Sequence, residues 1–263
     1  MTDRLRVATL NTLYYPQGDR WKARLPVAGA ALRELGADVV GLQEIDRAHD
    51  RDIALAALAP ERRYTVIRAA ETQRDRYPRH WDGVVTLVAA GAAMVEAHRT
   101  LRLTHRRIAQ ALDLRTPGGR LVRFANTHLH HPDGLPGFGV RLRQAQAVLG
   151  WLDDIETEAG RADVEVLVGD LNAIPMEPAI MALRDAGYRS AQEVANGRDA
   201  PTFASGLVAA SITPGPPRVC IDYIWVRGTA RIAAADLAFD RPSADDPTLY
   251  PSDHLGIVAD LEM

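Results

Sequence analysis

Short apolar runs recur along the chain, and their lengths are those of β-strands. Several of them are rich in Val and Ile, which favour extended structure. The runs occupy residues 5–10, 37–43, 64–68, 82–88, 120–129, 164–169, 220–226 and 255–263. Two more segments, 93–104 and 108–116, are expected to lie beside 120–129 as adjacent antiparallel strands.

Three segments between these runs have the spacing of apolar positions that is typical of amphipathic helices. Residues 20–35 are followed by Gly36, which is expected to end a helix there. Residues 139–158 show the clearest apolar face, and residues 177–186 carry Pro178 in their first turn. Mixed strands with helices between them indicate helices packed outside sheets, which predicts an α/β fold.

The size and composition of the chain fit one folded domain. It has 263 residues, of which 47% are hydrophobic and 25% charged, so it can bury a large core and disorder is not expected. The sequence contains no evident repeat and no long linker. Residues 1–263 are therefore predicted to form a single domain.

The sequence predicts a cytoplasmic protein without a membrane span. No run reaches the roughly 18 apolar residues of a transmembrane helix, and the first residues lead into a strand without the apolar segment of a signal peptide. Cys220 is the single cysteine, so no internal disulfide can form, which fits a reducing compartment. No feature indicates an obligate protein partner.

Polar side chains capable of catalysis stand at the ends of several predicted strands. They are Asn11, Glu44, His128, Asp170, Asn172, Asp222, Asp253 and His254. Each alone has a plainer explanation, because Asp and Asn are turn formers and a single His in a strand is usually a half-buried, hydrogen-bonded residue. Polar groups gathered at one rim of a sheet are the usual architecture of an α/β active site, and their combination favours that interpretation.

Read in order, the motifs NTL, LQE, NTHL, GDLN, IDYI and SDH resemble those of the endonuclease/exonuclease/phosphatase superfamily. They span residues 11 to 254, nearly the whole chain. The resemblance implies a deoxyribonuclease I-like fold, a two-sheet α/β sandwich in four layers with helices on both outer faces. It also implies an active site at one edge of the sandwich and a metal-dependent phosphoric ester hydrolase.

The resemblance assigns a metal site to three residues. Glu44 corresponds to the principal Mg²⁺ ligand, helped by Asn11 and Asp253. Carboxylate and carboxamide oxygens suit a hard dication that keeps several waters, so Mn²⁺ is an acceptable substitute.

The resemblance assigns the chemistry to five further residues. Asp170 orients or deprotonates the attacking water, and Asn172 holds the phosphate or the nucleophile. His128 and His254 donate hydrogen bonds to phosphoryl oxygens, and Asp222 pairs with His254 and fixes its tautomer. The implied reaction is in-line attack of water on phosphorus, with the developing charge stabilised by the metal and the histidines.

Two arginines and a run of histidines allow more than one interpretation. Arg141 and Arg143 follow a Gly-rich loop and resemble the family's R-x-x-Q helix start, so one is expected to reach a substrate phosphate. A solvated helix face explains either of them equally well. The segment HLHH at 128–131 raises the question of zinc, but it lacks the companion ligand spacing, and His130 and His131 are expected at the rim of the site.

The substrate is a phosphoester, either nucleic acid or a small molecule, and three hypotheses remain. They are a Mg²⁺-dependent phosphodiesterase or nuclease, which is preferred, a hydrolase of a small or lipid phosphoester, and a catalytically silent binding module. Leu13 stands where repair nucleases carry a second acid, which disfavours an abasic-site endonuclease, and the GDLNAIP and IDYIW segments disfavour an inositol phosphatase.

The net charge and two predicted loops bear on the choice among these three functions. The net charge of −3 weighs against a strong non-specific DNA binder, although arginine is abundant enough for a local basic patch. A basic rim around the site would favour the nuclease, and an apolar or enclosed pocket would favour the small-molecule hydrolase. Absence of metal binding would favour the silent binding module. Loops 69–81 and 240–251 are the expected substrate selectors.

Overall fold

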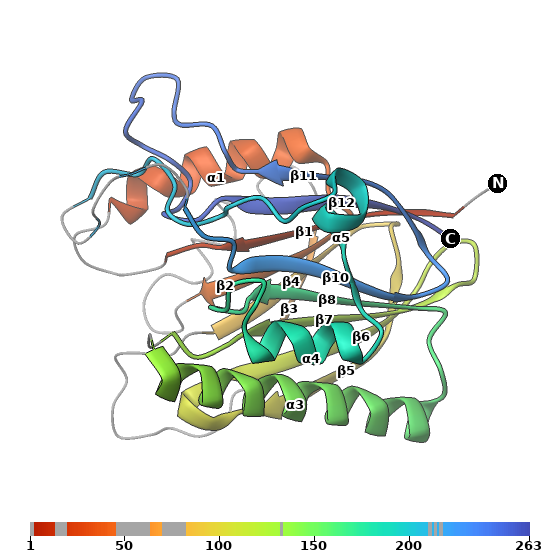
Figure 1. Ribbon diagram of the computed structural model, residues 1–263. Coiled ribbons are helices and arrows are strands. Elements are labelled where there is room, and N and C mark those ends of the chain that lie inside the picture. Colours follow the sequence, from red (N-terminus) through yellow and green to blue (C-terminus); the bar gives the residue numbers. More distant parts are fainter. Residues whose placement is uncertain are drawn as a thin grey trace, which may run out of the picture.

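Two six-stranded sheets pack face to face in the computed structural model, with helices on both outer sides (Figure 1). The structure describes residues 3–13, 20–45, 64–69, 83–131, 134–209, 212, 215 and 218–263. The two-sheet α/β sandwich expected from the sequence is confirmed.

The first sheet is mixed. Its strand order is β11 (Arg231–Ala238), β12 (Gly256–Glu262), β1 (Arg4–Asn11), β2 (Val39–Ile45), β4 (Gly83–Ala89) and β3 (Tyr64–Arg68). Strands β1 and β2 run parallel, and helix α1 (Trp21–Leu35) connects them. The other neighbours in this sheet are antiparallel.

The second sheet repeats this plan. Its order is β5 (Met94–Arg102), β6 (Ile108–Arg115), β7 (Leu121–His128), β8 (Val164–Asp170), β10 (Asp222–Gly228) and β9 (Arg189–Ser190). Strands β7 and β8 run parallel and are connected by the long helix α3 (Gly134–Ala159). The remaining elements are a short 3₁₀ turn, η1 (Thr104–Arg106), and helices α4 (Pro178–Asp185) and α5 (Ala191–Asn196).

Three apolar clusters hold the layers together. The largest lies between the sheets and joins side chains such as Val7, Phe124 and Ile257. A second joins α1 to the outer face of the first sheet, and a third joins α3 and α4 to the outer face of the second sheet. Figure 1 shows α1 on one side of the stacked sheets and α3 with α4 on the other.

The predicted elements largely match the observed ones, with two informative differences. The predicted helix 20–35 is α1, and Gly36 ends it in the left-handed conformation with φ 61°. The predicted loop 130–138 is partly helical, because α3 begins at Gly134 rather than at residue 139. Strand β11 and helix α5 were not predicted, since β11 is an edge strand with broken alternation and α5 has only six residues.

One predicted feature falls almost wholly outside this description. Of the predicted selector loop 69–81, only Ala69 belongs to the described residues. No helix among the described residues combines the length and apolar character needed to cross a membrane.

Candidate active site

The sheet topology itself explains why the predicted site residues meet. The carboxyl ends of parallel neighbours lie at the same sheet edge, and here β1, β2, β7 and β8 end at or near Asn11, Glu44, His128 and Asp170. Strands β10 and β12 run antiparallel to their neighbours β8 and β1, so it is their beginnings that reach this edge. Asp222 starts β10, and the segment that enters β12 carries His254.

Asp170 lies at the centre of the cluster and is buried. Its register partners are His128 on β7 and Asp222 on β10, so three functional side chains share one row across three strands. Its two oxygens accept different hydrogen bonds: Oδ1 from the Asn172 backbone N–H at 2.8 Å and Oδ2 from Asn11 Nδ2 at 2.9 Å. Burial, and then the neighbouring charge of Asp222, raise the pKa of Asp170 to about 6.

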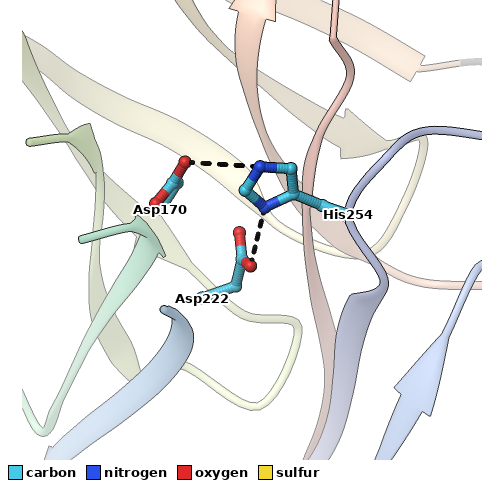
Figure 2. Close-up of side chains that lie close together, drawn as sticks. All are labelled: Asp170, Asp222 and His254. Atoms are coloured by element: carbon cyan, nitrogen blue, oxygen red, sulfur yellow. Dashed lines mark hydrogen bonds and ion pairs between the residues drawn. The ribbon is translucent and has the colours of Figure 1, made fainter. Parts of the chain in front are cut away.

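His254 lies between two carboxylates, as Figure 2 shows. Its Nδ1 is 2.9 Å from Asp222 Oδ2, and its Nε2 is 3.8 Å from Asp170 Oδ2. Burial acts to lower the pKa of His254, but Asp222, Asp253 and Asp170 outweigh it and raise the pKa well above its usual value. The imidazole is therefore held as a cation whose Nε2 faces Asp170. The contact of its Nδ1 with Asp222 is the pairing expected from the sequence, and the role of His254 in catalysis stays a prediction.

Asp222 and His254 are in turn held by a loop segment that the sequence did not single out. The Asp222 backbone N–H donates to Thr202 Oγ1 at 3.2 Å, and the ring of Phe203 lies 4.8 Å from the His254 ring, centroid to centroid. Asp222 Oδ1 is a buried oxygen without a hydrogen-bond partner in the described structure.

His128 faces Asp170 from the other side. Its Nε2 is 3.4 Å from Asp170 Oδ2 and 3.0 Å from Asn172 Nδ2. Burial, Arg107 and His254 lower the pKa of His128 well below its usual value, so it is neutral where His254 is charged. The two histidines thus flank one carboxylate in opposite protonation states.

Glu44 and Asn11 stand together at the neighbouring strand ends of the first sheet. Asn11 Nδ2 donates to Glu44 Oε1 at 3.1 Å as well as to Asp170, and Asn11 Oδ1 accepts the backbone N–H of Leu13 at 3.0 Å. Glu44 is half-buried and has φ 57°, an unusual backbone conformation for a residue other than glycine. Strained backbone of this kind is found at functional sites when the surroundings hold it.

The donor chemistry of this corner fits a hard dication. Glu44 supplies a partly accessible carboxylate, and Asp253 supplies a carboxylate whose pKa is raised by burial. The Asn11 oxygen accepts the Leu13 N–H while its Nδ2 faces Glu44, so the amide would have to turn over to become a ligand. Donor atoms of a second group, Asp170, Asp222 and His254, also lie within 4.8 Å of one another, a spacing that could hold a metal. In that group His254 Nδ1 is already engaged by Asp222, so the oxygens around Glu44 suit Mg²⁺ better.

The two predicted substrate arginines lie in different environments. Arg141 is buried, and its Nε and one Nη donate to Glu177 Oε2 at 2.9 and 2.7 Å while the other Nη donates to the His130 carbonyl at 3.2 Å. It therefore ties the segment after β7 to the start of α4. Arg143 is exposed on α3. Substrate contact by either arginine stays a prediction, and the ion pair leaves Arg143 as the more available of the two.

The histidines after His128 lie at the rim, as expected from the sequence. The His130 ring stacks on that of His105 at 4.2 Å, and burial together with His105 lowers the pKa of His130 to about 4. His131 Nδ1 lies 3.4 Å from an Nη of Arg107.

Arg107 is the site residue that motif reading missed. It is buried, and its Nη1 is 2.9 Å from His128 Nδ1. The sequence did contain a signal for this residue. Segments 108–116 and 120–129 are expected to be antiparallel neighbours, so Arg107, which precedes the first strand, should lie opposite the end of the second strand, near His128. Such pairing arguments find residues that belong to no motif.

Comparison with known proteins agrees with this geometry. The sequence model of the Endonuclease/Exonuclease/phosphatase family matches residues 8–254. The chain belongs to this family. The match runs across both sheets and includes all eight strand-end residues, so the expected family resemblance is confirmed. Among curated protein sequences, none matches significantly.

Solved structures of this family share the fold. A family member from Bacteroides vulgatus is 23% identical with a TM-score of 0.76, covering 99% of either chain. The human Nocturnin catalytic domain with bound sulfate is 22% identical with a TM-score of 0.74, covering 99% of this chain and 94% of that one. D. rerio TDP2 complexed with a single-strand DNA product is 14% identical with a TM-score of 0.75, covering 99% of either chain. At these identities the likeness establishes the fold.

Proposed function

We propose that this protein hydrolyses phosphoester bonds with the help of a bound Mg²⁺ ion, and that its preferred substrates are phosphodiesters. The observation that carries the proposal is the surroundings of Asp170. One buried carboxylate accepts hydrogen bonds from Asn11 and Asn172 and lies within 3.8 Å of the Nε2 atoms of His128 and His254. This arrangement suits a group that orients and deprotonates a water beside a bound phosphate.

The residues divide the reaction between them. Asp170 takes the proton of the attacking water, and its hydrogen bonds from Asn11 and Asn172 aim the carboxylate. The charged His254, held by Asp222, and the neutral His128 supply N–H donors to the phosphoryl oxygens, on which negative charge develops. Mn²⁺ is expected to replace Mg²⁺, and such an ion, held by Glu44 with Asn11 and Asp253, would supply positive charge to the phosphoryl oxygens and the leaving group.

The rim supports nucleic acid as the first substrate class. His105, Arg106 and His131 are exposed beside His128, and they form a rim of basic and imidazole side chains. The structural neighbour TDP2 was solved with a single-strand DNA product.

A small or lipid phosphoester is the second candidate. Ile174 and Met176 follow Asn172 directly and are 41% and 80% exposed, which offers an apolar contact to a leaving group. A silent module is disfavoured because each mapped catalytic position holds a chemically competent residue. A single domain, a cytoplasmic location and independence from a protein partner remain predictions.

The test is hydrolysis of bis(p-nitrophenyl) phosphate by the wild type, by Asp170→Asn and by Asp154→Asn, each with Mg²⁺ and with EDTA. Asp154 is exposed on α3, so its variant makes the same change of charge away from the site. We expect Mg²⁺-dependent turnover in the wild type and in the control, with a loss of about 10²- to 10⁴-fold in Asp170→Asn.

Two results would overturn the proposal. One is full activity in a folded Asp170→Asn variant. The other is a folded wild type that, with Mg²⁺, hydrolyses neither this diester, nor p-nitrophenyl phosphate, nor single-stranded DNA or RNA.

A further inference from the structure

Arg107 contacts a catalytic histidine through the ring nitrogen that faces away from the phosphate site. Its Nη1 lies 2.9 Å from His128 Nδ1, and a second Nη lies 3.4 Å from His131 Nδ1. The guanidinium is buried, with 5% of the residue exposed. A contact this short between two nitrogens is a hydrogen bond only if one of them accepts.

The direction of this hydrogen bond follows from the chemistry of the guanidinium. Arginine has five N–H donors, no acceptor, and a proton that it does not lose in proteins. His128 Nδ1 must therefore be the acceptor, which means that it carries no proton. A neutral imidazole with a bare Nδ1 has its single hydrogen on Nε2, the nitrogen that faces Asp170 at 3.4 Å.

A neutral imidazole has one acceptor nitrogen, so His128 cannot accept from both Arg107 and the Asn172 amide. The charged guanidinium is the stronger donor, and Asp170 Oδ2 lies 3.4 Å from Nε2 and can accept its N–H, so Nδ1 is the acceptor and the contact with Asn172 is not a hydrogen bond. Asn172 Nδ2 is 3.0 Å from His128 Nε2 and donates to the Leu129 carbonyl at 3.1 Å, which fixes the amide with its NH₂ group on this side. The amide NH₂ carries a second hydrogen. Two N–H groups, one from each side chain, thus lie next to each other beside Asp170. Adjacent donors of this kind are satisfied by one negatively charged oxygen placed between them.

We propose that Arg107 is a positioning residue that holds His128 in the Nε2–H form, so that His128 and Asn172 together make a two-donor site for one phosphoryl oxygen. The part that concerns the phosphoryl oxygen rests on the proposed function. The part that concerns the tautomer does not depend on it.

The backbone around Arg107 is built to keep the guanidinium in place. Its carbonyl accepts the Leu103 N–H at 2.8 Å across the η1 turn. Gln144 of α3 then links that turn to the segment after β7, because its Nε2 donates to the Thr104 carbonyl at 2.8 Å and its Oε1 accepts the His130 N–H at 2.9 Å. Arg107 and His128 are thereby held against each other from both sides.

The first experiment reads the tautomer directly. Protein labelled with ¹⁵N at its eight histidines is measured by long-range ¹H–¹⁵N correlation near neutral pH, and the His128 signals are those that vanish in His128→Gln. We expect a protonated Nε2 and an unprotonated Nδ1. A protonated Nδ1 in the wild type would overturn the proposal, and this measurement needs neither substrate nor activity.

The second experiment removes the donor. In Arg107→Met we expect His128 to lose the single-tautomer signature, and in Arg107→Lys, which keeps an obligate donor, to retain it. Arg161→Met is the control, because Arg161 is an exposed arginine before β8, at the end of that strand away from Asp170. A wild-type signature in folded Arg107→Met would overturn the proposal. Should that variant not fold, the wild type and Arg107→Lys still decide the matter.

Kinetics then test the link to the phosphoryl oxygen. We expect kcat on a diester to fall about tenfold to a hundredfold in Arg107→Met with KM nearly unchanged, since a donor is lost mainly in the transition state. Arg107→Lys should recover part of kcat, and Arg161→Met should not affect it. An altered tautomer with unchanged kcat would refute the two-donor site. A wild type without any activity would instead refute the proposed function and leave the tautomer result standing.

Discussion

At the scale of single residues, Gly169 shows how closely the site is packed. It precedes Asp170 with φ 142°, and a Cβ built on it would lie 1.9 Å from the Thr127 carbonyl oxygen of the neighbouring strand β7. That oxygen belongs to the backbone of the buried sheet, so it cannot move aside. Only glycine allows β7 and β8 to approach closely enough for His128 and Asp170 to share one row.

We therefore expect Gly169→Ala to lower the free energy of unfolding by at least about 3 kcal/mol. Urea denaturation followed by circular dichroism measures this. Gly150→Ala is the control, because Gly150 is in helix α3 and no described residue outside its own turn lies within 4 Å of the position that a methyl group would take. That variant should gain about 0.5–1 kcal/mol. Equal stability of the two variants would contradict the assigned role of Gly169.

At the scale of elements, a polar bridge between the sheets lies at the irregular end of β2. The pairing of β2 with β4 shifts register between Leu42 and Ile45, and Glu44 lies within this irregularity. Asn126 of β7 crosses the sandwich there: its Nδ2 donates to the carbonyls of Leu42 at 3.2 Å and Val85 at 3.0 Å. Its Oδ1 accepts from Gln43 Nε2 at 2.8 Å. One fully buried amide thus supports the irregularity that carries the proposed metal ligand.

We expect Asn126→Ala to cost about 2–4 kcal/mol of unfolding free energy, because the Gln43 amide and two carbonyls are left buried without this partner. Chemical denaturation with the linear extrapolation gives the value. The control is Asn196→Ala, which removes one hydrogen bond, to the Ala235 carbonyl, from an exposed residue at the end of α5. A loss no larger than that of the control would show that the bridge is dispensable.

At the scale of the whole molecule, the proposed metal site predicts that Mg²⁺ binding and folding are linked. The proposed ligands Glu44, Asn11 and Asp253 come from three separate parts of the chain, so the unfolded chain does not bring them together. Mg²⁺ at a hundredfold excess over its Kd should then raise the free energy of unfolding by about 2.7 kcal/mol. Thermal or urea unfolding with Mg²⁺ and with EDTA measures this without any substrate.

Glu44→Gln should lose most of this Mg²⁺ effect, whereas Glu158→Gln, an exposed position on α3, should keep it. If Mg²⁺ does not stabilise the wild type, or stabilises Glu44→Gln equally, then Glu44 is not the principal ligand. The first of these results would also favour the silent binding module over the hydrolase.

The sequence predicts which side chains of the site lie at strand ends, but it does not predict which of them contact one another. Apolar runs place Asp170 and His128 at the ends of neighbouring strands, and the order of the motifs adds Asp222 and His254. The hydrogen bond between Asn11 and Asp170 joins residues 159 positions apart, and no local pattern contains it. The left-handed backbone of Glu44 is also invisible to periodicity, since no spacing of apolar residues specifies it.

By itself the sequence determined most of the strands, the main helices and the family, because apolar spacing and short motifs are properties of neighbouring residues. Tertiary structure alone decided which charges meet. Arg141, one of two arginines expected to reach a phosphate, lies in a buried ion pair with Glu177, whereas Arg107, in no motif, contacts His128. A guanidinium acquires its function from the partner it reaches, and that partner is set by the packing of segments far apart in the chain.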